Sequence, residues 1–272
     1  MTTASPANAA AVAEPAPRRR GPPRLVEVLS VQTLSPLMRR ITFGGASLAG
    51  FSTPQPAGYI KLIFPEPGQT EPPPFNPDGP RPTSMRTYTP RRFDPQALTI
   101  EVDFVLHGEG PAGLWAAQAA AGQRLLMMGP GPGYTPDANA SEFMLIGDDS
   151  ALPAIEMILE SLPAGARATV VVEVVDAAEE RPLPGAVHTT LHWAHRGADA
   201  RSTGDAALHV LERLPAPAPT TQVYIACEAG AMRRIRQWAA EHWPVPRPQT
   251  IGRGYWKLGN VNHPDHDYGA DA

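Results

Sequence analysis

The sequence predicts two domains, an antiparallel β-barrel followed by a doubly wound α/β domain with a parallel sheet. The chain has 272 residues, 42% of them hydrophobic, which is enough apolar material for two cores. Short β-rich runs separated by proline and glycine fill its first half, a pattern typical of a small closed barrel. Beyond Pro136, compact apolar runs alternate with helical segments, as in a parallel sheet covered by helices.

The barrel is expected over residues 24–136. Residues 1–23 precede it and are rich in alanine and proline without apolar periodicity, so we expect a disordered tail there. A proline-rich stretch at residues 65–82 forms an excursion from the barrel rather than a domain boundary. The barrel strands are expected at residues 25–31, 39–43, 59–64, 88–90, 98–106 and 123–128.

The α/β domain is expected over residues 137–259, and the polar residues 260–272 after it are expected to form a flexible C-terminal tail. Continuous apolar runs predict buried parallel strands at residues 143–146, 168–175, 187–193 and 223–226. Helices are expected at residues 151–162, 205–211 and 228–241.

Charge and cysteine content narrow the functional classes. A formal net charge of −4 provides no basic field for a nucleic acid. The single cysteine, Cys227, excludes an intrachain disulfide and a thiolate-ligated metal cluster, which suits a reducing cytosol. The sequence has no run of about 18 apolar residues and no secretory signal, so we expect a cytoplasmic protein without membrane contact. It has no heptad pattern either, so we expect a monomer.

Residues 86–89, Arg-Thr-Tyr-Thr, bring a cation, an aromatic ring and hydroxyl groups onto one extended segment. On a strand, Arg86 and Tyr88 share a face. A guanidinium matches a phosphate, a phenol ring covers a flat heterocycle, and a hydroxyl or backbone amide bonds a ring nitrogen. These groups meet the needs of a flavin nucleotide, although the tetrapeptide alone is equally compatible with an ordinary barrel strand.

About twenty residues later, the segment from His107 to Ala116 runs from a strand end through glycines into a helix. Pro111 near the first helical turn, with glycines before it, leaves backbone N–H groups where a diphosphate can bind the positive end of the helix dipole. Many loops that bind nothing contain similar glycine turns.

Four motifs in this order resemble the siderophore-interacting protein family, whose fold is ferredoxin-reductase-like. They are the Arg-x-Tyr-Thr strand, the His-Gly-x-Gly-Pro-Ala turn at residues 107–112, Gly-Asp-Asp-Ser-Ala-Leu-Pro-Ala-Ile at residues 147–155 and Gly-Tyr-Trp-Lys-Leu-Gly at residues 254–259. The resemblance extends from about residue 24 to residue 259. It implies an FAD-binding barrel, an NAD(P)H-binding α/β domain and the reduction of ferric siderophores.

The resemblance also implies roles for individual residues. Arg86 would hold a flavin phosphate, Tyr88 would pack along the isoalloxazine, and Thr89 would lie near its reactive nitrogen. The turn after His107 would bind the diphosphate and ribityl region, residues 147–153 would open the nicotinamide site, and Tyr255 would lie against the flavin with Trp256. The implied cofactor-binding residues are Arg86, Thr87, Tyr88, Thr89, His107, Gly110, Pro111, Ala112, Gly113, Trp115, Asp148, Ser150, Ala151, Tyr255 and Trp256.

Lys61 and Lys257 match two of the basic positions with which the family binds its commonly anionic substrate. For Lys61, a solvated strand residue is an equally good interpretation. The third basic position falls in the loop of residues 129–133, Gly-Pro-Gly-Pro-Gly, which has no arginine. A second departure is Gly113, where a hydroxyl residue is common in the family.

Other reactive side chains receive less specific interpretations. The histidines of residues 188–195 have spacings that metal ligands use on helices, but this segment is predicted as a strand, so we expect surface or packing roles. Cys227 is expected to be a small buried residue rather than a redox thiol. Arg181, Arg196 and Arg201 lie in the half of the chain that would select NADPH, and each is expected to be a surface charge.

The expected activity is therefore FAD-mediated electron transfer from NADPH or NADH to a ferric siderophore or another ferric chelate, which requires no acid or base residue. A small redox protein is an alternative donor. Two other functions stay open, a general NAD(P)H:flavin or quinone oxidoreductase and a flavin-free siderophore-binding protein.

Overall fold

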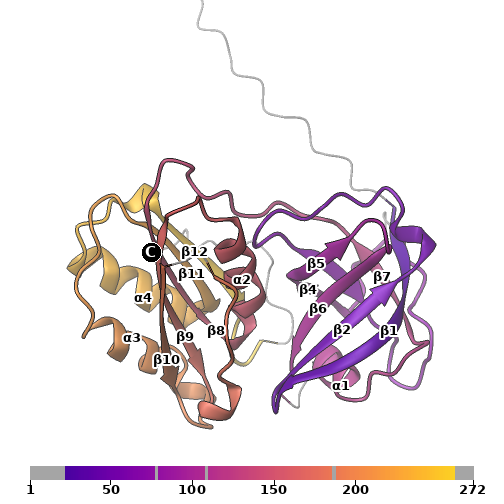
Figure 1. Cartoon of the computed structure of the whole chain (residues 1–272). Helices are drawn as coiled ribbons and strands as arrows, with labels where there is room; N and C mark the ends of the chain where they lie inside the picture. The colour runs from indigo at the N-terminus through magenta and orange to yellow at the C-terminus, as the bar shows by residue number, and fades with distance from the viewer. Residues whose placement is uncertain (1–21, 77–78, 108–109, 186–187, 261–272) are drawn as a thin grey trace, which may run out of the picture.

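The computed structural model describes residues 22–76, 79–107, 110–185 and 188–260 (Figure 1). The tails were predicted at residues 1–23 and 260–272, and all of their residues except 22, 23 and 260 lie outside the described residues. Gly108 and Glu109 of the expected diphosphate turn also lie outside them. Short 3-10 helices occur at Ala46–Leu48, Asp149–Ala151, Ala177–Glu179, Ala200–Ser202 and Arg247–Gln249.

The first domain is one rolled antiparallel sheet with the strand order β4-β3-β7-β1-β2-β6-β5. Its inward-facing aliphatic and aromatic side chains form a single core. Trp115 of helix α1 closes one end of this core, with its ring 5.3 Å from Phe64 and 6.2 Å from Phe43, measured between ring centroids. The elements are β1 (Arg24–Ser35), β2 (Met38–Gly44), β3 (Ile60–Ile63), β4 (Met85–Tyr88), β5 (Pro90–Asp94), β6 (Thr99–Val105), α1 (Gly110–Ala117) and β7 (Arg124–Met128).

The two edge strands of this sheet, β4 and β5, follow one another in the chain with only Thr89 between them. The sheet therefore rolls back on itself at Thr89, although the described residues show no β4–β5 ladder that closes the barrel completely. The prediction of one strand at residues 88–90 was wrong. β4 pairs with β3 and β5 pairs with β6, so the chain leaves one edge of the sheet and enters the other within this short segment.

The second domain is a five-stranded parallel sheet with the order β10-β9-β8-β11-β12. Helix α2 packs on one face, and helices α3 and α4 cover the other. The last strand, β12, had not been predicted, because its glycine-interrupted sequence lacks an apolar run. The elements are β8 (Glu142–Asp148), α2 (Leu152–Ser161), β9 (Arg167–Val174), β10 (His188–His195), α3 (Asp205–Leu211), β11 (Gln222–Glu228), α4 (Ala229–His242) and β12 (Thr250–Trp256).

The two domains share a packed interface, and α2 lies on the side of the α/β domain that faces the barrel (Figure 1). Met38 and Tyr134 from the first half of the chain are buried in the core that α2 forms with its sheet. Glu179 accepts hydrogen bonds from the Leu37 amide at 3.0 Å and from the Ser35 hydroxyl, which fixes the β1–β2 turn against the second domain.

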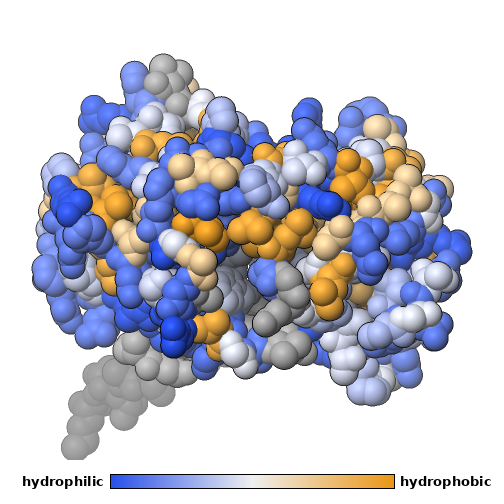
Figure 2. Space-filling view, turned by 90° about the horizontal axis from the view of Figure 1, so that it is seen from below, coloured by the Kyte–Doolittle hydropathy of each residue, from blue (hydrophilic) through white to orange (hydrophobic). Residues whose placement is uncertain are grey.

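Hydrophobic side chains gather across the middle of the face seen from below, between the two domains (Figure 2). Of the helices in the described part of the chain, none combines the length and apolarity needed to cross a membrane.

Candidate functional site

The Arg86–Thr89 segment is held rigidly by the barrel. β4 pairs with β3, which places Tyr88 opposite Ile60 and Arg86 opposite Leu62. The Tyr88 ring lies 4.5 Å from that of Phe104, between centroids, and burial raises the pKa of its phenol, so the ring is a neutral planar surface. Arg86 and Tyr88 are two residues apart on β4 and therefore lie on the same face of the strand.

Arg86 is a half-buried guanidinium without a carboxylate partner among the described residues. Its Nη1 donates to the backbone carbonyls of Thr83 and Met85, at 2.7 and 2.8 Å. Burial lowers the pKa of Arg86, because no nearby carboxylate compensates for the lost hydration. An arginine held in this way fits the phosphate of a nucleotide, which would supply the missing negative charge.

Helix α1 is anchored through Trp115, which is only 8% exposed in the barrel core. Its first turn contains no acidic residue, so its N-terminus suits an anion. Gly113 is buried beneath the imidazole of His107, and a Cβ at position 113 would lie 3.4 Å from that ring. Gly110 has a φ of +72°, which favours glycine at the turn. Ala112 is buried and Pro111 is half-buried.

On the second domain, Asp148 ends β8 and its side chain is almost completely buried. It accepts hydrogen bonds from the Ser150 amide at 3.0 Å, the Glu228 amide at 3.0 Å and the indole Nε1 of Trp256 at 2.8 Å. Burial, followed by the neighbouring charge of Asp149, raises the pKa of Asp148 to about 7.

The glycine turn after β8 depends on close packing. A Cβ at Gly147 would lie 2.8 Å from the Cβ of Ala151 and 2.9 Å from the carbonyl oxygen of Ala226, so only glycine fits. Ala151 is itself fully buried in the core, while Ser150 is half-buried at the start of the helical segment.

The two halves of the predicted site meet at Tyr255. Its hydroxyl lies 3.0 Å from that of Tyr224, and the side chain of Thr89 lies near enough to lower its pKa. Thr89 belongs to the Arg-Thr-Tyr-Thr segment and Tyr255 to β12, so the structure brings together segments separated by more than half of the chain. Burial raises the pKa of Tyr255, which keeps this hydroxyl protonated.

The two lysines predicted to bind substrate differ in exposure. Lys257 is exposed just after β12. Lys61 is only 4% exposed, on the side of β3 opposite the core residues Ile60 and Leu62, so its interpretation as a solvated strand residue was wrong.

The loop of residues 129–133 has a physical reason for lacking an arginine. The Gly131 amide donates to the Tyr59 carbonyl at 2.7 Å, and a Cβ at Gly131 would lie 2.2 Å from Cζ of the Tyr59 ring. A Cβ at Gly133 would lie 2.3 Å from the carbonyl oxygen of Pro56. The aromatic ring of Tyr59 thus occupies the space that a side chain at position 131 would need.

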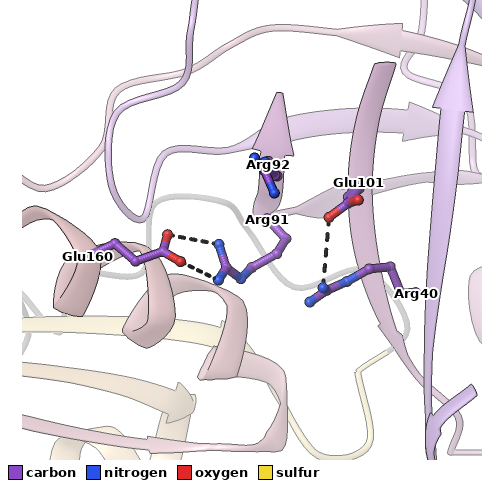
Figure 3. A pocket seen from close by; sticks show the side chains of 5 residues that line it. All are labelled: Arg40, Arg91, Arg92, Glu101 and Glu160. Carbon is purple, nitrogen blue, oxygen red and sulfur yellow. Dashed lines mark hydrogen bonds and ion pairs between the residues drawn. The ribbon is translucent and has the colours of Figure 1, made fainter. Parts of the chain in front are cut away.

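A second cluster, absent from the sequence-based site, joins the domains through ion pairs. Arg91 of β5 reaches α2, donating to Glu160 at 2.6 and 2.9 Å and to Glu156. Arg40 makes two bonds with Asp103, at 2.7 and 2.8 Å. Arg40 and Arg91 line a polar pocket of about 360 Å³ between the barrel and α2 (Figure 3). The pocket is lined by Arg40, Arg91, Arg92, Glu101 and Glu160.

Three arginines considered for NADPH selection lie in different environments. Arg181 donates to Glu156 at 2.9 Å and Arg196 to Asp149 at 2.8 Å, and both side chains are largely buried. The expectation that these two are surface charges was therefore wrong, because each compensates a buried carboxylate. Arg201 is a surface charge as expected, paired with Asp199.

Cys227 is 3% exposed, and burial raises the pKa of its thiol. Both observations agree with the expected role as a small buried residue. The described residues contain no group of three or more side chains placed to hold a metal ion. His195 instead contacts Glu180, at 2.7 Å.

The first domain is a rolled antiparallel sheet with an Arg-x-Tyr-Thr strand and a helix N-terminus, and the second is a parallel sheet. This arrangement defines a ferredoxin-reductase-like protein whose first domain binds FAD. Residues 27–134 match the model of the siderophore-interacting FAD-binding domain, and residues 140–259 match that of the siderophore-interacting protein. The chain therefore belongs to the siderophore-interacting protein family, which confirms the resemblance seen in its motifs.

Three known proteins illustrate this relationship. A siderophore utilization protein from T. fusca has a similar crystal structure, with a TM-score of 0.81 and 36% identity over 90% of this chain and 96% of that chain. The ferric vibriobactin reductase ViuB of Vibrio cholerae is 30% identical over 90% of this chain and 93% of its own length. The NADPH-dependent ferric-chelate reductase of Escherichia coli is also 30% identical, covering 86% of this chain and 92% of its own.

Proposed function

We propose that the chain is an FAD-containing, NAD(P)H-dependent ferric-siderophore reductase that releases iron as Fe(II) in the cytoplasm. The observation that carries this proposal is that the side chain of Thr89 lies near that of Tyr255, which brings the Arg-Thr-Tyr-Thr segment to the carboxyl end of the parallel sheet. Ligands of open α/β sheets bind at this end of the strands. A flavin on the first domain and a nicotinamide on the second would therefore lie close together.

On the barrel, Arg86 would bind a flavin phosphate, Tyr88 would support the isoalloxazine, and Thr89 would lie near the reactive ring nitrogen. The turn from His107 into α1 would hold the diphosphate through backbone N–H groups. When bound, FAD supplies two-electron acceptance from a nicotinamide and one-electron delivery to ferric iron. The protein contributes position and exclusion of water, so none of these side chains needs to transfer a proton.

On the α/β domain, Ser150 and the start of the helical segment at residues 149–151 would orient the nicotinamide nucleotide. Trp256 and Tyr255 would shield the reacting rings from solvent. The name of the Escherichia coli relative supports NADPH as donor, although NADH and a small redox protein are also to be tested.

The substrate is proposed to be an anionic ferric siderophore or another ferric chelate, attracted by the exposed Lys257. The names of the vibriobactin and ferric-chelate reductases support this substrate class. One observation favours a second candidate, a general NAD(P)H:flavin or quinone oxidoreductase. Tyr59 fills the space beside Gly131, so the loop of residues 129–133 presents an aromatic ring. A cation at this position would strengthen the binding of an anionic siderophore, and its absence favours a less specific substrate.

The test is a visible absorption spectrum of the purified protein, followed by anaerobic NADPH, NADH and then a ferric chelate or a quinone. We expect flavin absorption near about 450 nm, bleaching with a nicotinamide and recovery with the ferric chelate. Recovery with quinone alone would favour the second candidate. A protein that stays colourless after incubation with FAD would contradict both and favour a flavin-free siderophore-binding protein.

A further inference from the structure

The carboxylate of Asp148 connects three neighbouring strands at the carboxyl end of the parallel sheet. Asp148 ends β8, Glu228 ends β11 and Trp256 ends β12. Its Oδ2 accepts from the Glu228 amide at 3.0 Å and from the Trp256 indole at 2.8 Å, whereas Oδ1 accepts from the amide and the hydroxyl of Ser150. Each carboxylate oxygen therefore accepts two hydrogen bonds, which saturates it.

The pairing of β11 with β12 is irregular at this point. Cys227 lies opposite Gly254 but Glu228 lies opposite Trp256, so Tyr255 is skipped in the register. Such an irregularity redirects side chains. The Tyr255 hydroxyl lies 3.0 Å from that of Tyr224, and the indole of the next residue, Trp256, donates to Asp148. Among the described residues that donate to Asp148, only Trp256 does so with a side chain from another strand.

We propose that Asp148 is a positioning residue, which acts by fixing the Trp256 indole at the carboxyl end of the sheet rather than by touching a bound nucleotide. A hydrogen bond to an ionised carboxylate is about twice as strong as a neutral one. The orientation of the indole therefore depends on the charge of Asp148. Trp256 and the short 3-10 helix at Asp149–Ala151 are both bonded to this one carboxylate.

The charge of Asp148 is set by a crowded environment, and burial raises its pKa to about 7. This value already includes the repulsion from Asp149, which raises the pKa, and the hydrogen bonds from Ser150 and Trp256 and the charge of Arg196, which lower it. The titratable and charged groups facing this cluster from the surrounding elements are Asp149, Glu173, Arg196, Cys227, Glu228 and Tyr255. The strength of the Trp256 hydrogen bond is expected to change near neutral pH.

The experiment is an NMR titration of the full-length chain carrying ¹⁵N in its tryptophan indoles. Each of the five tryptophans carries one Nε1–H group, and the signal that disappears in Trp256→Phe is that of Trp256. In the wild type, this signal is expected to move with a midpoint at about pH 7. In Asp148→Asn the titration is expected to disappear, while the Trp193 and Trp243 signals stay in place and report an intact fold.

Asp149→Asn is the matched control, because this neighbouring carboxylate bonds to Arg196 and not to Trp256. It removes the repulsion from Asp149, so the Trp256 titration is expected to persist with a lower midpoint. The wild type and this variant test the proposal even if Asp148→Asn does not fold. A Trp256 signal that is insensitive to pH in the wild type, or that titrates unchanged in Asp148→Asn, would overturn the proposal.

Only the consequence for turnover rests on the proposed function. At pH 8, Asp148→Asn is expected to lower kcat/KM for the nicotinamide by at least about tenfold while the bound FAD content stays unchanged. The NMR measurement needs neither flavin nor substrate, so a failure of the proposed function and a failure of this inference give different results.

Discussion

Glu156 on α2 is the carboxylate at which the connection between the two domains can be tested. Its side chain is 4% exposed and lies between arginines from both domains. Arg181 donates to it at 3.2 and 2.9 Å, Arg91 donates to it from β5, and Arg40 lies 3.9 Å away. Glu156→Gln keeps the shape of this side chain and removes the charge that these guanidinium groups share.

The expected cost follows from burial. Removing one partner of a buried ion pair costs about 3 to 5 kcal/mol, because the other charge is left uncompensated. In Glu156→Gln, Arg91 keeps Glu160 and Arg181 keeps Asp103, which lies 3.7 Å away. The loss is therefore expected at the lower end, about 3 kcal/mol in the free energy of unfolding.

Equilibrium unfolding in urea measures this loss, with Glu71→Gln as the matched control. Glu71 pairs with Arg124 at 2.7 Å, but their side chains are 55% and 43% exposed, so its loss is expected to cost less than about 1 kcal/mol. Added salt is expected to weaken the Glu71 pair more than the buried cluster. Equal losses for the two variants would refute the assignment of the cluster as the connection between the domains.

Three further predictions concern the site. Arg86→Ala is expected to weaken FAD binding about 30-fold, since lost charged hydrogen bonds cost about 2 kcal/mol; an unchanged Kd in a fluorescence titration would contradict its phosphate role. Gly131→Arg is expected to lower the free energy of unfolding by about 1 to 3 kcal/mol, because the new side chain crowds Tyr59. Adding Tyr59→Ala is expected to relieve this crowding. If urea unfolding shows that the losses of the two single variants simply add in the double variant, the explanation is wrong. Because burial raises the Asp148 pKa to about 7, against about 3.9 when unfolded, the folded state binds more protons between these pH values. The free energy of unfolding of the wild type, measured in urea, should therefore fall as the pH rises between these two values, and it should fall more steeply than that of Asp148→Asn. If both proteins show the same dependence on pH, the pKa of Asp148 is not raised.

The two-part fold and the family were both predictable from the sequence, and so were the segments that we propose to carry the site. Alternating and continuous apolar runs report which faces of a strand are buried, and this signal is local. The Arg-Thr-Tyr-Thr segment and the glycine turn before α1 are also recognisable locally, because their spacing and turn chemistry lie within a few residues. Gly147 was part of a recognised motif for the same reason, and the structure adds the close contact that requires it.

The tertiary structure alone decided which distant side chains meet. Asp148 and Trp256 are 108 residues apart, and their hydrogen bond exists because β8, β11 and β12 end together. The cluster around Glu156 depends on how α2 docks on the barrel, and no local pattern pairs it with Arg91. Strand order and domain docking are set by the packing of the whole core. The charges that the sequence places on separate segments thus become buried ion pairs only after folding.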